Sequence, residues 1–280
     1  MNILDPQGPI GAVERTILID SVAIMLAIVL PTILAIFGFA FWFRASNTKA
    51  RYQPDWAYSG AIELVVWAVP ALTVILLGGV AWIGAHDLDP AKAIAGASKP
   101  LRIQAVSLDW KWLFIYPDQK IAAINTLTVP AGVPLQFELT SASVMNAFFI
   151  PQFGSMIYTM NGMTSRLNLR ADTPGMFRGL SAHFSGDGFS DMYFDVHVVP
   201  PAQFAQWAGG ASGTEKGLDA RSYGEIARPS IGNAQAMYRL ADPDLFQSIV
   251  TQKLPPSTGA QSGVKGASLQ EGQEGIADAR

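Results

Sequence analysis

The chain has 280 residues, half of them hydrophobic, and a formal net charge of −3 at pH 7. The absence of cysteine excludes disulfide bonds, thiolate metal sites and cysteine nucleophiles. The mildly acidic balance, with no basic cluster, gives no reason to expect nucleic-acid binding.

Two long apolar runs lie in the first third of the chain. Residues 22–43 and 64–85 carry no charged side chain, and each run is long enough to cross roughly 30 Å of hydrocarbon as a helix. Each contains one proline, Pro31 or Pro70, which neighbouring helices accommodate in a membrane. The first run is too long to be the core of a signal peptide. We therefore predict a two-helix transmembrane hairpin over residues 21–86.

The orientation of the hairpin follows from charge. The loop between the runs carries Arg44, Lys49 and Arg51, whereas acids are more common in the outer flanks. The positive-inside rule places this loop in the cytoplasm, so that residues 1–20 and everything after the second run lie outside.

Glu63 stands at the start of the second run, with Trp67 and Pro70 at helical spacing on the same face. A carboxylate at a membrane boundary can be a solvated helix end. Ionisable groups at membrane depth are, however, functional candidates by default. The residue pattern by itself leaves both interpretations open.

From about residue 99 the hydrophobic period changes to two, which is typical of half-buried strands. Turn signals stand at 130–132 (PAG) and 173–175 (TPG). Short strands at this spacing predict a β-sandwich or barrel over residues 99–200. The expected strands are 101–107, 111–116, 125–129, 133–140, 165–170 and 192–199.

After Pro200 the pattern changes again, and we predict a helical C-terminal region over residues 201–253. The last of its helices has an aspartate and a proline at its start, as helix N-termini often do. Residues 254–280 are rich in Gly, Ser and Gln, which is typical of a disordered tail. The expected helices are 202–208, 222–228, 233–240 and 242–250.

The segment SAHFSGDGFSDM (181–192) has the spacing of a metal-binding loop without its strong ligands. With MNAFFIP (145–151), it is similar to the copper-ligand frame of subunit II of the haem-copper oxidases. There a His-x4-Pro stretch and a Cys-x3-Cys-Gly-x2-His-x2-Met stretch bind two copper ions on a cupredoxin fold, with soft thiolates as bridges. This comparison identifies Asn146, Ser181, His183, Ser185, Phe189 and Met192 as degenerate copper-site positions. Only Met192 keeps a ligand-type side chain, so we expect no metal or cofactor in this chain.

That combination resembles the copper-free subunit II of quinol oxidases of the cytochrome bo3 type. The resemblance covers about residues 3–250 and implies a two-helix transmembrane hairpin plus an all-β cupredoxin-like sandwich with short C-terminal helices. It also rests on ILDPQGPIG (3–11), SLDWKWLFIYPDQ (107–119), FFIPQFGSMIYTMNGM (148–163) and GFSDMYF (188–194).

The resemblance implies a structural, non-catalytic subunit of a proton-pumping enzyme that couples ubiquinol oxidation to the reduction of O2 to water. Haems and copper would belong to subunit I, its partner together with further small membrane subunits and lipid. Both termini and the β domain would be periplasmic, at a bacterial inner membrane. Glu63 would lie at the cytoplasmic mouth of the K-channel, a proton path.

Family members are commonly lipoproteins, acylated on a cysteine just before the Asn2–Pro6 stretch. Met1 stands at that place here, and the sequence leaves lipidation open. Two other functions also stay open. One is a membrane-tethered cupredoxin-like binding or assembly module. The other is a cytochrome c oxidase subunit II with its own copper, against which the missing cysteines count.

The remaining aromatic and histidine residues suggest no further site. We expect Trp110 and Trp112 on one face of a strand, packed in the sandwich or against the catalytic subunit. The resemblance places aromatics here on the electron route of copper-bearing relatives, and the sequence leaves such a role open for these two residues. His86 is expected near the membrane interface, and His197 on a polar strand face where it is solvated or contacts a partner. The three histidines, His183 included, are too scattered to predict a zinc or copper site.

Overall fold

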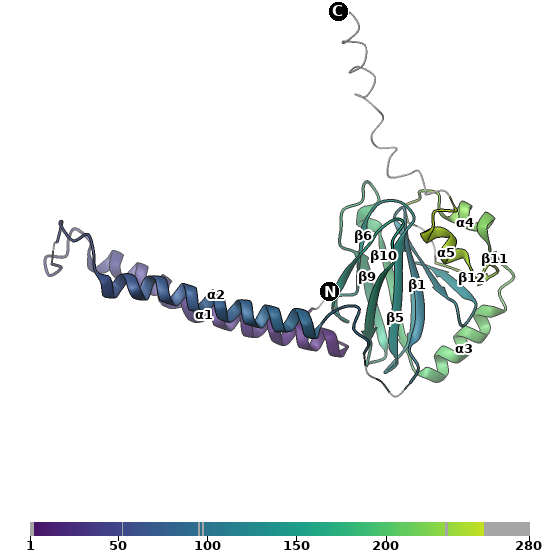
Figure 1. Cartoon of the computed structure of the whole chain (residues 1–280), viewed down its shortest axis with the longest axis horizontal. Coiled ribbons are helices and arrows are strands. Elements are labelled where there is room, and N and C mark those ends of the chain that lie inside the picture. The colour runs from purple at the N-terminus through teal and green to yellow at the C-terminus, as the bar shows by residue number, and fades with distance from the viewer. Residues whose placement is uncertain (1–2, 52, 95, 97, 233–234, 255–280) are drawn as a thin grey trace, which may run out of the picture. The chain divides into compact units, whose positions relative to one another are not determined.

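The computed structural model describes residues 3–51, 53–94, 96, 98–232 and 235–254. These fall into two compact units, shown in Figure 1: the described residues from Val13 to Asp89, and those up to Ala12 together with those from Pro90 onward. The tail predicted over 254–280 lies, apart from its first residue, outside the described residues.

The smaller unit is a helical hairpin made of α1 (Pro9–Trp42) and α2 (Gly60–Asp87). Among the described residues these are the two helices long and apolar enough to cross a membrane. α1 begins well before the predicted apolar run, with a proline in its first position, where a missing N–H costs nothing. Gly84 is the single buried residue of α2, and the Ile17 side chain lies directly over it. Nearly all apolar side chains of the hairpin therefore face outward.

The larger unit is a β-sandwich, as predicted. One sheet has seven strands in the order β11-β12-β3-β2-β1-β5-β8, and the other has five in the order β4-β10-β9-β6-β7. The strands are β1 (Leu101–Leu108), β2 (Lys111–Tyr116), β3 (Ile121–Ile124), β4 (Thr126–Pro130), β5 (Pro134–Ser141), β6 (Asn146–Phe149), β7 (Met156–Thr159), β8 (Ser165–Arg170), β9 (Gly175–Ser181), β10 (Tyr193–Val199), β11 (Gly217–Leu218) and β12 (Ala236–Leu240).

Aromatic side chains fill the space between the sheets. The Phe148 and Phe194 rings stack with centroids 5.3 Å apart, and Trp112 meets both rings edge-on. Gly179 leaves room for this cluster, because a Cβ there would collide with the Phe194 ring. Full burial of such large side chains is the main source of stability for the sandwich.

Three helices follow the sandwich: α3 (Pro201–Ser212), α4 (Ala220–Ile226) and α5 (Leu245–Val250). α3 packs Phe204 and Trp207 against the Tyr116 ring. α4 and α5 supply a second apolar cluster on the outer face of the seven-stranded sheet. Both faces of β2 are therefore covered, which explains its unbroken apolar run LFIY.

The helix predicted over 233–240 is wrong. Residues 236–240 form β12, which pairs antiparallel with β3 and also with the short β11. Ala, Met, Arg and Leu are good helix formers, but the open edge of β3 supplies hydrogen bonds that outweigh this local preference. The C-terminal region is thus part strand and part helix, and it is built into the sheet.

The ILDPQGPIG segment docks on the sandwich through its main chain. The Gln7 N–H donates to Gln152 O at 2.7 Å, and the Gly11 N–H donates to Phe153 O at 3.2 Å. Gly8 has no room for a side chain, because a Cβ would overlap Arg170 O. The chain at Pro90 lies along the edge of β8, where the Asn168 main-chain N–H donates to Pro90 O at 2.8 Å.

Candidate functional site

The degenerate copper-site positions come together at one end of the five-stranded sheet. Asn146 begins β6, Ser181 ends β9, and the following loop passes through a short 3-10 helix, η1 (Phe189–Asp191), into β10. Asn146, Ser181 and Met192 are almost fully buried. The pairing of β6 with β9 brings the first two side by side, although they are far apart in the chain.

Ser181 and Asn146 form a buried polar pair. The Ser181 hydroxyl donates to Asn146 Oδ1 at 3.0 Å and lies 3.3 Å from the main-chain oxygen of His183. The Asn146 amide group donates to Val144 O at 3.3 Å. Buried polar groups are stable when they are hydrogen-bonded in this way.

The other positions line the same loop. The Ser185 hydroxyl lies 3.9 Å from the sulfur of Met192. Phe189 packs its ring edge-on against Phe184, with centroids 5.6 Å apart. His183 is half-buried and its ring meets the Tyr158 ring edge-on. The structure thus gathers all six predicted positions around one loop, but through packing and neutral hydrogen bonds.

The donor chemistry of this loop does not fit a dinuclear copper centre. Copper bridged by two ligands is best served by thiolates, whereas the two equivalent positions here carry neutral serine hydroxyls. An amide and a phenyl ring stand where imidazoles would be needed. In the part of the chain that the structure describes, no group of three or more His, Asp or Glu residues could hold a metal ion.

Removing the Ser181 hydroxyl tests how much the polar pair contributes. Ser181→Ala leaves the buried Asn146 oxygen without its donor, so we expect a loss of about 1–3 kcal/mol in unfolding free energy. Ser185→Ala loses only a weak contact to sulfur and is expected to change stability by less than about 0.5 kcal/mol. Chemical denaturation of the two variants compares these values directly. Equal effects would contradict the assignment of the structural role to Ser181.

Trp110 and Trp112 do not share a strand face, so that prediction is wrong. Trp112 lies in β2 and is fully buried in the core. Trp110 lies in the turn before β2 with a positive φ of 63°, which turns its ring away from the core. Its indole N–H donates to Ser185 O at 3.0 Å. The sequence pattern did not indicate this contact with the loop.

The remaining histidines are isolated from one another. His197 is half-buried, and its Nε2 is buried with no hydrogen-bond partner among the described residues. His86 lies in the last turn of α2, where its Nδ1 is 2.8 Å from Trp82 O and its ring stacks on Trp82.

Glu63 lies in the first turn of α2, where its main-chain N–H donates to Ser59 O at 2.9 Å. Its side chain is exposed within the hairpin unit. Trp67 lies one turn further along the same face and is 75% exposed. A carboxylate in the first turn also suits the positive end of the helix dipole.

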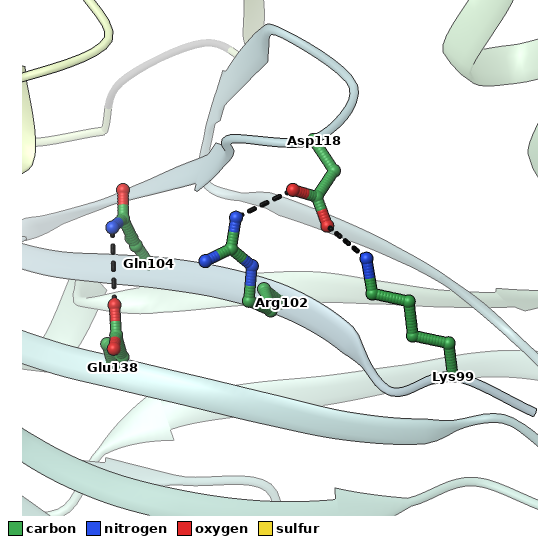
Figure 2. Close-up of polar contacts among 5 residues, drawn as sticks. All are labelled: Lys99, Arg102, Gln104, Asp118 and Glu138. Atoms are coloured by element: carbon green, nitrogen blue, oxygen red, sulfur yellow. Dashed lines mark hydrogen bonds and ion pairs between the residues drawn. The ribbon is translucent and has the colours of Figure 1, made fainter.

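Figure 2 shows polar side chains from β1 and β5, together with Lys99 before β1 and Asp118 in the turn between β2 and β3. Arg102 donates to Asp118 at 2.7 Å, and this hydrogen bond holds the pKa of the Asp118 carboxyl below its usual range. Lys99 lies 3.9 Å from the same carboxylate, and Gln104 donates to Glu138 at 3.2 Å. Exposed pairs of this kind contribute at most about 1 kcal/mol, so we assign them no functional role.

Comparison with known proteins gives relatives over most of the chain. It is 43% identical over 252 residues to cytochrome bo(3) ubiquinol oxidase subunit 2 of Pseudomonas aeruginosa, which covers 90% of this chain and 76% of that protein. It is 42% identical over 254 residues to ubiquinol oxidase subunit 2 of Acetobacter aceti, which covers 90% and 82%. The chain belongs to the ubiquinol oxidase subunit 2 family.

This membership confirms the predicted resemblance. A quinol oxidase subunit 2 of Bacillus cereus is 34% identical over 230 residues, covering 82% of this chain and 79% of that protein. No protein-family model matches the chain. Among solved structures, the periplasmic domain of subunit II of the Bradyrhizobium japonicum cytochrome oxidase is 24% identical over 42% of this chain. Its TM-score of 0.40 is too low to support an argument. This member of the family is a membrane protein, with two membrane-length helices among its described residues.

Proposed function

We propose that the chain is the copper-free subunit 2 of a proton-pumping ubiquinol oxidase in a bacterial inner membrane. It is a structural subunit of a complex that oxidises ubiquinol and reduces O2 to water. Electrons reach the haems and copper of subunit I without passing through this chain. The β-sandwich and both termini lie on the periplasmic side.

The observation that carries this proposal is the donor set of the 181–192 loop. Serine hydroxyls replace the thiolates that a dinuclear copper centre requires, and one of them is already committed to a hydrogen bond with Asn146. An oxidase that takes electrons from a quinol inside the membrane has no need for a copper relay on the outer domain. The loss of the copper ligands is therefore consistent with ubiquinol, a donor inside the membrane, as the source of electrons.

The hairpin supports the proposed partners. Leu64, Val74 and Ile75 are each about 70% exposed within the hairpin unit, and apolar surface of this kind requires lipid or other membrane helices around it. We propose that one side faces subunit I and that lipid and further small membrane subunits cover the rest. The basic loop at Arg44, Lys49 and Arg51 supports a cytoplasmic position for the helix connection.

Glu63 is proposed to take up protons at the cytoplasmic end of α2. Two observations support this role: its position at the border of an apolar helix, and a side chain that is exposed within the hairpin unit and so available to a neighbouring subunit. A proton path needs as its first group a side chain that can exchange protons with water, and a carboxyl group at the end of a helix is of that type.

Oxygen uptake by the affinity-purified complex tests the proposed electron donor. Ubiquinol and reduced cytochrome c are supplied in parallel to the same preparation. We expect uptake with ubiquinol and none with cytochrome c, because the outer domain has no metal to accept an electron from a soluble protein. Sustained uptake with cytochrome c would overturn the copper-free assignment.

The same preparation separates the other two functions. A stand-alone binding or assembly module would purify without a large haem-bearing partner and would consume no oxygen. A cytochrome c oxidase subunit would bring copper beyond that of subunit I, which metal analysis of the isolated chain would detect.

A further inference from the structure

The turn between β1 and β2 holds its central residue in an unfavourable conformation. Trp110 has a φ of 63°, in the left-handed region that bulky side chains rarely adopt. Such a conformation persists only where the surroundings determine it. The contacts of Trp110 and its neighbours therefore show why this conformation is kept.

The Trp110 ring lies against the 181–192 loop. Its N–H donates to Ser185 O at 3.0 Å. A Cβ on Gly188 would lie 2.5 Å from ring atoms of Trp110, and a Cβ on Gly186 would lie 3.5 Å from the ring. Gly188 has an ordinary φ of −92°, so its backbone does not require glycine. The Trp110 ring occupies the space that a side chain at position 188 would need, and this explains the glycine there.

The residues on either side of Trp110 hold two further segments. The buried Lys111 Nζ donates to Arg228 O at 2.7 Å and also to the Ser230 hydroxyl. On the other side, Asp109 accepts a hydrogen bond of 2.5 Å from the Ser143 hydroxyl. Burial lowers the pKa of Lys111, and the charge of Asp109 opposes that shift.

The segment held by Lys111 also reaches the loop. The Ile231 side chain approaches the same face of Gly188 as Trp110 does, 2.9 Å from the position of a Cβ. Residues 109–111 therefore contact three segments that are distant in sequence: the chain around residue 143, the 181–192 loop and the 228–231 segment.

We propose that Asp109–Lys111 is a clamp that fixes the 181–192 loop and the 228–231 segment by protein contacts alone, with Trp110 and Lys111 as its positioning residues. Trp110 holds the loop, and Lys111 holds the C-terminal segment over it. The contacts themselves carry this proposal, so it stands whether or not the electron donor is ubiquinol.

Hydrogen–deuterium exchange of the affinity-purified complex tests the clamp. In Trp110→Gly the backbone conformation becomes easy to adopt while the ring is lost. We expect peptides from 181–192 to exchange roughly tenfold faster, because local opening sets the exchange rate of these amides. Lys111→Met is expected to raise exchange in 228–231 with little change in 181–192. Lys111→Arg keeps a charged donor and is expected to restore slow exchange.

Gly188→Ala disrupts the same contact from the side of the loop, because the added methyl group collides with the Trp110 ring. It is expected to raise exchange in 181–192 as Trp110→Gly does. Gly209→Ala is the matched control, since no atom outside its own helix lies near a Cβ there, and we expect it to leave 181–192 unchanged. If Trp110→Gly does not accumulate, Trp110→Phe decides, because it keeps a ring but loses the bond to Ser185. Unchanged loop exchange in Trp110→Gly, or in Trp110→Phe where that variant decides, overturns the clamp.

A further measurement, with a copper chelator added, keeps the test of the clamp separate from the test of the proposed function. Adding a copper chelator to the wild-type complex is expected to leave loop exchange unchanged, since the clamp uses no metal. Faster exchange with chelator would overturn a clamp made by protein contacts alone. The oxygen-uptake comparison of ubiquinol with cytochrome c is read independently of either arm.

Discussion

Phe148→Ala is expected to lower the unfolding free energy of the β-sandwich by about 3–5 kcal/mol, the usual cost of deleting a fully buried phenylalanine. Phe148 has no exposed surface. Its ring stacks on Phe194 with centroids 5.3 Å apart, and the Trp112 and Phe137 rings lie at the same distance. Alanine would leave a cavity lined by four aromatic rings, because Phe114 also meets Phe148 edge-on, and these rings come from both sheets. Denaturant unfolding of the purified chain in detergent, followed by tryptophan fluorescence, measures the loss.

Phe184→Ala is the matched control for this measurement. It removes the same side chain from the surface, where Phe184 is 73% exposed, and we expect a change within about 0.5 kcal/mol. If both variants lost similar stability, the aromatic cluster would not be the centre of the core.

Glu63→Gln is expected to slow ubiquinol oxidation by the assembled complex roughly tenfold, less than the ~10²–10⁴ of a proton-transfer group in a reacting site. Glutamine keeps the size and polarity of the side chain, so α2 is expected to assemble normally. It cannot carry a proton. The measurement is steady-state oxygen uptake with ubiquinol, normalised to haem content so that any loss of assembly is visible.

Two variants show whether the carboxylate itself is responsible. Glu63→Asp keeps the ionisable group and is expected to retain most of the activity. Asp55→Asn removes a negative charge from the loop that precedes α2 and is expected to have little effect. If Glu63→Gln turns over and pumps protons like the wild type, Glu63 has no role in proton uptake. Its charge would then only stabilise the N-terminus of α2.

The sequence predicts the two units and the strands of the sandwich where one face meets solvent. The segment 165–170 alternates clearly, and the structure has β8 there. The strand β6 (NAFF) was not predicted, because three of its four residues are buried and no alternation remains. The segment 236–240 consists mainly of helix-forming residues, and only the unpaired edge of β3 makes it a strand.

The candidate site was predicted as a set of positions but not as a set of contacts. The spacing of Ser181, Ser185 and Met192 locates the loop. Only the pairing of β6 with β9, however, brings Asn146 within 3.0 Å of Ser181. The role of Trp110 depends on a positive φ that no sequence rule assigns to tryptophan. Such contacts arise from tertiary structure and leave no periodic signal.

The partner of β3 comes late in the chain. Ile124 pairs with Ala236, more than a hundred residues further on. A chain made from its N-terminus therefore has one sheet edge open, and this edge is paired only when the last strands have been made. Open edges of this kind are where other chains pair and aggregation begins. Truncation before residue 236 would leave that edge permanently open, so the final segment of the fold also protects the newly made protein from pairing with other chains.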